Sequence, residues 1–130
     1  MNAPSGGRRR ECSPSDARQR LHDADAFLEA ALRASDPDVK ATNAIHSAIT
    51  SADAICCVAL GRRSADGNHV AAAQLLSIVD RRLSTALRRA IDRKTQAGYE
   101  SRDISAQDAE SCVRQATMLL EGARARVRAV

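Results

Sequence analysis

The chain has 130 residues, a formal net charge of +4 and a sequence pI of about 9.2. Hydrophobic residues make up 44% and charged residues 28% of it, which excludes an intrinsically disordered chain and fits one globular domain. Only two of the 20 basic residues are lysines, Lys40 and Lys94. Arginine suits phosphate contacts, but the coding bias of the source genome explains the same preference.

The composition also limits what can fill the core. The only aromatic residues are Phe27 and Tyr99, so alanine and the aliphatic residues must form the interior. These residues favour closely packed helices, and no alternating β-branched pattern predicts a sheet. We therefore predict an all-α, single-domain bundle of four to five helices with up-down topology.

The four cysteines follow no local pairing pattern. Cys12, Cys56, Cys57 and Cys112 form no C-x-x-C motif, and no histidine lies at zinc-ligand spacing from a cysteine pair. We expect four thiols in a reducing cytoplasm, without a metal site. No apolar run follows the first residues, and no segment reads as long and apolar enough to span a membrane.

The predicted elements begin with a flexible basic tail over residues 1–12, followed by a helical bundle over residues 13–130. Ser13, with Pro14 and Asp16 behind it, is expected to cap a first helix that reaches about residue 34. Its apolar stripe includes Leu21, Leu28 and Leu32.

A second helix is expected over residues 38–60, after the break at residues 35–38, with Gly61 as its C-cap. The predicted buried side of this helix consists of Val39, Ile45, Ala48, Ile49, Ala52, Ile55, Cys56 and Ala59. A polar loop should follow over residues 62–68, turning at Asp66 and Gly67.

Three more signals complete the chain. A short helix should run from residue 68 or 69 to residue 79, with Leu75, Leu76, Ile78 and Val79 as its apolar side chains. Asp80 can cap a fourth helix ending near Gly98, with Leu83, Leu87, Ala90, Ile91 and Lys94 facing inward. Ser105 begins the last helix, with Asp108 at the capping-box position.

Three segments within this order of predicted helices resemble the HEPN (higher eukaryotes and prokaryotes nucleotide-binding) superfamily. They are residues 48–55 of the second helix with Leu60 and Gly61, residues 67–69, and residues 94–99 together with residues 105–109. The resemblance covers about residues 20–125 and implies a HEPN-like bundle.

The active members of that superfamily are metal-independent endoribonucleases, whose motif is an arginine followed a few residues later by a histidine. The corresponding positions here are Arg93 and Tyr99, so the resemblance marks these two as candidate catalytic residues. Histidine exchanges protons near neutral pH and tyrosine ordinarily does not. Tyrosine in place of the motif's histidine therefore favours a nucleic-acid-linked role over cleavage. It leaves open whether the chain is an enzyme.

Six residues are candidates for binding a nucleotide or RNA: Asp53, His69, Arg89, Arg93, Lys94 and Tyr99. Asp53 lies in an apolar stretch, where an unpaired carboxylate is costly; it either faces Arg93 or Lys94 or lies on the solvent side. Lys94 could equally be an exposed helix-end cation, Tyr99 a core residue and His69 a solvent-exposed cap. His22 and His46 have no partner pattern.

A basic stripe of Arg81, Arg82, Arg88, Arg89 and Arg93 could follow a phosphate backbone, or could be the solvated side of an amphipathic helix. The chain contains no P-loop and no dinucleotide-binding glycine motif, so no cofactor is expected.

Three functions remain open. The first is a HEPN-like nucleotide- or RNA-binding module, part of a bacterial toxin–antitoxin or defence system. The second is an interaction protein without a nucleic-acid role, and the third is an endoribonuclease with a divergent Arg93/Tyr99 site. The expected partners are a second copy of the chain, RNA or a nucleotide, and an antitoxin or nucleotidyltransferase.

Overall fold

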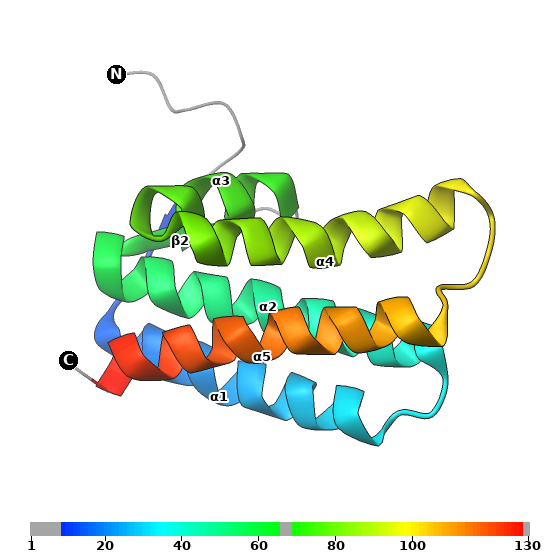
Figure 1. Ribbon diagram of the computed structural model, residues 1–130. Helices are drawn as coiled ribbons and strands as arrows, with labels where there is room; N and C mark the ends of the chain where they lie inside the picture. Colours follow the sequence, from blue (N-terminus) through cyan, green and yellow to red (C-terminus); the bar gives the residue numbers. More distant parts are fainter. Residues whose placement is uncertain (1–8, 66–68, 129–130) are drawn as a thin grey trace.

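The computed structural model describes residues 9–65 and 69–128, and it confirms the all-α up-down bundle (Figure 1). The helices are α1 (Pro14–Arg33), α2 (Pro37–Leu60), α3 (His69–Val79), α4 (Arg81–Tyr99) and α5 (Ala106–Arg128); the strands are β1 (Arg9–Glu11) and β2 (Arg62–Ser64). The expected turn at Asp66 and Gly67, and residues 1–8 of the expected tail, lie outside the described residues.

Local capping chemistry explains where the helices begin and end. Ser13 and Asp16 form a complete capping box at the start of α1. Asp80 caps α4 through the backbone N–H of Leu83. Gly61 ends α2 with φ of 70°, in the left-handed region that glycine adopts without a Cβ clash. The expected caps at Ser13, Asp80 and Gly61 are thus confirmed.

The second helix, α2, is the centre of the bundle and packs against α1, α3, α4 and α5. Alanines permit this close packing: Ala24 of α1 and Ala44 and Ala48 of α2 have no exposed surface. Between the two helices, the Ser47 hydroxyl donates a 2.7 Å hydrogen bond to the carbonyl oxygen of Ala24.

By length and composition alone, α2 could cross a membrane, so the expectation that no segment would qualify is wrong for this helix. Its most apolar window is 67% buried inside the bundle. Core helices of this kind meet the same criterion, and here the burial accounts for the apolar sequence.

Four residues assigned to the core lie at its edge. Leu32, Val39 and Ile78 are 59%, 50% and 60% exposed, and Ala59 is also exposed. Each lies within one or two turns of a helix end, where the neighbouring helices no longer cover the apolar stripe.

The structure differs most from expectation at residues 9–12. These residues were expected to belong to a flexible tail, but β1 pairs antiparallel with β2. A disulfide joins Cys12 to Cys57 at the end of α2, and the Cys12 N–H donates to the carbonyl oxygen of Gly61. The expectations of no sheet and of four thiols were therefore wrong here; Cys56 and Cys112 are buried thiols.

Candidate nucleic-acid interface

The exposed side of α4 carries most of the positive charge of that helix. Arg81, Arg82, Arg88 and Arg89 are exposed, and none has an ion-pair partner among the described residues. The only carboxylate within α4 is Asp92. The opposite side packs into the core through Leu83, Leu87 and Ala90, so the fold holds the arginine row facing outward.

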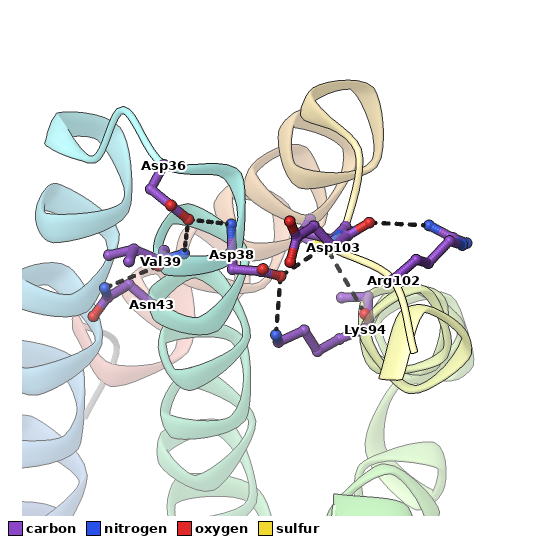
Figure 2. A network of polar contacts seen from close by, with 10 residues as sticks. Asp36, Asp38, Val39, Asn43, Lys94, Arg102 and Asp103 are labelled. Atoms are coloured by element: carbon purple, nitrogen blue, oxygen red, sulfur yellow. Dashed lines mark hydrogen bonds and ion pairs between the residues drawn. The ribbon is translucent and has the colours of Figure 1, made fainter. Parts of the chain in front are cut away.

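Lys94 is fixed near the other end of α4 by an ion pair. Its ammonium donates to Asp38 Oδ1 at 3.2 Å, and the same oxygen accepts from the Ile104 N–H at 3.3 Å (Figure 2). The Ile104 hydrogen bond and then Lys94 hold the pKa of the Asp38 carboxyl below its ordinary value. Lys94 is therefore neither fully inward nor a free helix-end cation, but connects α4 to the start of α2.

Beside Lys94 lies a cleft of about 270 Å³ between α2, α3 and α4. Its walls are formed by Thr42, Ile45, His46, His69, Ile91, Lys94 and Thr95. Isoleucines supply an apolar surface, while two imidazoles, two hydroxyls and the lysine supply polar groups. A small pocket that combines apolar walls with a few polar groups is typical of a ligand site.

The cleft adjoins the arginine row. Arg88 and Ile91 are three residues apart on α4, a spacing that places side chains next to each other on a helix surface. Of the six candidate binding residues, the cleft unites His69 and Lys94, and the row contains Arg89. His46 joins them, although no sequence pattern singled it out; its ring also packs edge-on against Phe27, with centroids 5.3 Å apart.

Arg93 and Tyr99 do not meet within one chain. The Arg93 Nε donates to the hydroxyl of Ser111 on α5 at 2.8 Å, so its guanidinium is directed into the α4–α5 contact. Tyr99 is 87% exposed at the end of α4, which corrects the alternative that it is a core residue. The two positions are six residues apart on the helix, which corresponds to roughly 9 Å of rise and 120° of rotation. An Arg93/Tyr99 catalytic site in a single chain has no support in this geometry.

Asp53 lies elsewhere, and both expectations for it were wrong. It is 8% exposed, so it is not on the solvent side. Its partner is not Arg93 or Lys94 but Arg63, whose Nη1 lies 3.9 Å from Asp53 Oδ2. Burial raises the pKa of the Asp53 carboxyl to about 6, against the opposing effects of Arg63 and Arg20.

The chain was compared with protein-family models, curated proteins and solved structures, and none of them matches.

Proposed function

We propose that this chain is an RNA- or nucleotide-binding helical module that holds phosphate groups on the exposed side of α4. The observation that carries the proposal is the row of four exposed arginines without ion-pair partners among the described residues. Guanidinium groups bind phosphates with two parallel hydrogen bonds, and each phosphate contact releases counterions from the nucleic acid.

Single-stranded RNA suits this surface better than a duplex. Tyr99 is the residue on which a base can stack, because it is exposed and lies on the same side of α4 as Arg81 and Arg88, which precede it by 18 and 11 residues. The row from Arg81 to Tyr99 spans roughly 27 Å of helix. Arginines combined with an exposed aromatic ring are the usual elements of a single-strand binding surface.

The cleft beside the row gives a bound strand a place for one nucleotide. Arg88 precedes Ile91 of the cleft wall by three residues on α4. Ile45 and Ile91 offer apolar walls to a base, and His46, His69 and Lys94 offer hydrogen bonds. These features support binding. Because Arg93 is engaged by Ser111, the proposal does not include cleavage at Arg93 and Tyr99.

The proposal keeps the HEPN resemblance as its context. In that context the module acts within a bacterial toxin–antitoxin or defence system, with a second copy, an antitoxin or a nucleotidyltransferase as partner. The all-α bundle of five helices is compatible with that context, and the arginine row supplies the surface that RNA would use.

The test is the affinity for a short single-stranded RNA, measured by fluorescence anisotropy. Arg88→Gln/Arg89→Gln should weaken binding by about tenfold or more, since two charge-assisted phosphate contacts are lost. Arg18→Gln/Arg33→Gln on α1 removes the same charge from a helix on the other side of α2 and should leave the affinity nearly unchanged. Equal losses in both variants would contradict the proposal, as would the absence of binding in the unmodified chain.

One observation favours the second candidate, an interaction module that uses α3 to form a homodimer. Val70 and Ile78 are 51% and 60% exposed on this short helix, and their separation places them roughly 12 Å apart along the axis and about 80° apart around it, on one broad side. Sedimentation equilibrium of the unmodified chain and of Val70→Gln/Ile78→Gln tests this. A dimer that becomes monomeric in the variant would support the second candidate, and a monomer in both would exclude this face.

A further inference from the structure

A second polar cleft lies away from α4, where β1 and β2 meet the first turns of α1. Its volume is about 320 Å³. Three guanidinium groups line it, one from each element: Arg10 of β1, Arg20 of α1 and Arg63 of β2. Neither the α4 row nor the cleft at His69 uses any of these residues, so the second cleft needs its own explanation.

The register of the two strands places two arginines opposite each other at this cleft. Arg10 is the direct partner of Arg63 in the antiparallel ladder, and like charges placed opposite one another destabilise a strand pair. Arg20 adds a third cation. The resulting repulsion is one reason why the pKa of Arg63 is lowered, after the larger effect of burial.

The acidic groups nearby do not neutralise these arginines by direct contact. Asp16 accepts from the backbone N–H of Ser13 in the capping box, and Asp23 accepts from Gln19. Within the described residues, neither Arg10 nor Arg20 has a carboxylate within ion-pair distance, and the only such carboxylate for Arg63 is the buried Asp53 at 3.9 Å. The carboxylates of Glu11, Asp16 and Asp23 line the same cleft, and the partner of Glu11 in the strand register is Arg62.

We propose that this cleft binds the phosphate group of a small molecule, with Arg10, Arg20 and Arg63 as its ligands, and that the Cys12–Cys57 disulfide keeps the site assembled. A phosphate dianion would remove the repulsion among the three guanidiniums and match their planar donor geometry. A small molecule fits better than a nucleic-acid strand, because none of the described residues that line the cleft offers an aromatic ring for base stacking.

The disulfide connects this site to the redox state of the surroundings. Cys12 itself lines the cleft and follows Arg10 by two residues. Its bond to Cys57 fixes the end of β1 against the end of α2, and β1 carries Arg10 into register with Arg63. Reduction removes this covalent attachment, and Arg10 then depends on a ladder of three residue pairs that includes a like-charge pair.

The experiment is an NMR titration of the full, oxidised chain with inorganic phosphate, with sodium chloride at equal ionic strength as the reference. Saturable shifts should appear at residues 10–12, 16–23 and 62–64 with phosphate and not with chloride. Arg20→Gln should raise the dissociation constant by about tenfold, the size expected for one charge-assisted hydrogen-bonded contact. Arg18→Gln removes an exposed arginine two residues earlier on α1, outside the lining of this cleft, and should change the dissociation constant less than about twofold.

Shifts that do not saturate, or that chloride reproduces, would overturn the site. So would equal dissociation constants for Arg20→Gln and Arg18→Gln. Reduction of the disulfide should weaken phosphate binding severalfold; unchanged binding after reduction would overturn the role of Cys12 and Cys57. A short RNA added to the same sample distinguishes the sources of phosphate: shifts from RNA in this cleft, in place of α4, would contradict the small-molecule assignment.

Discussion

The ionisation of Asp53 should make the stability of this bundle depend on pH in an unusual direction. Burial raises the pKa of this carboxyl from 3.8 to about 6, so the folded chain holds a proton that the unfolded chain has lost. The free energy of unfolding therefore falls as pH rises between these two values. The contribution is fully present below pH 3.8 and is lost by the time the pH has passed 6.

The size of the effect follows from the same two values. A rise from 3.8 to about 6 corresponds to about 3 kcal/mol of destabilisation by the ionised form. Asp53→Asn removes the titration while keeping a side chain of similar shape. Relative to this variant, the unmodified chain should lose about 2.4 kcal/mol of stability between pH 4 and pH 7, the remainder of the effect lying below pH 4.

Urea unfolding followed by helical circular dichroism, repeated across this pH range for both chains, measures the difference. Groups common to both chains cancel in the comparison. Arg63→Gln provides a directional control: Arg63 opposes the rise in the pKa of Asp53, so its removal should move the midpoint to higher pH. Parallel curves for the unmodified chain and Asp53→Asn would refute the reasoning.

Three further stability predictions follow from individual contacts. Replacing Cys12 and Cys57 with serine should lower the free energy of unfolding by about 4 kcal/mol, the chain-entropy value for a separation of 45 residues, measured by urea denaturation under oxidising conditions. Leu119→Ala should cost about 2–5 kcal/mol because Leu119 has no exposed surface; a loss below 1 kcal/mol would contradict its place in the core. Asp36→Ala should lower the free energy of unfolding by about 1 kcal/mol, because Asp36 Oδ1 accepts from the N–H groups of Asp38 and Val39 at the start of α2. Asp92→Ala, at an exposed position of α4, serves as the matched control.

The helix ends were predictable because their signals are local. Ser13, Gly61 and Asp80 act on N–H or C=O groups within four residues of themselves, so the sequence contains the whole interaction. The apolar stripes were predictable in their middle turns. The predicted burial was wrong at Leu32 and Val39, because exposure there depends on how far a neighbouring helix extends.

The missed features all depend on distant parts of the chain. A strand of three residues, such as β1, is too short to show an alternating pattern. Cys12 and Cys57 are 45 residues apart, and no spacing motif identifies such a pair. Asp53 was recognised as a costly carboxylate, but its neighbour Arg63 could be found only once β2 was placed beside α2.

The candidate site was predictable where it depends on one helix and not where it depends on contacts between helices. Arg81, Arg82, Arg88 and Arg89 form a row on one helix, which helical periodicity reveals. The cleft requires three helices to meet, so His69 and Lys94 could be named individually, but their proximity to His46 could not.

The most direct test of the central proposal is the salt dependence of RNA affinity in the unmodified chain and in Arg88→Gln/Arg89→Gln. If both arginines contact phosphates, the slope of the logarithm of affinity against the logarithm of salt concentration should become shallower by about 1.4, or about 0.7 for each contact with a single strand. The proposal predicts this change, with no comparable change in Arg18→Gln/Arg33→Gln. Identical slopes in all three chains would contradict it and would leave the arginine row as the solvated side of α4.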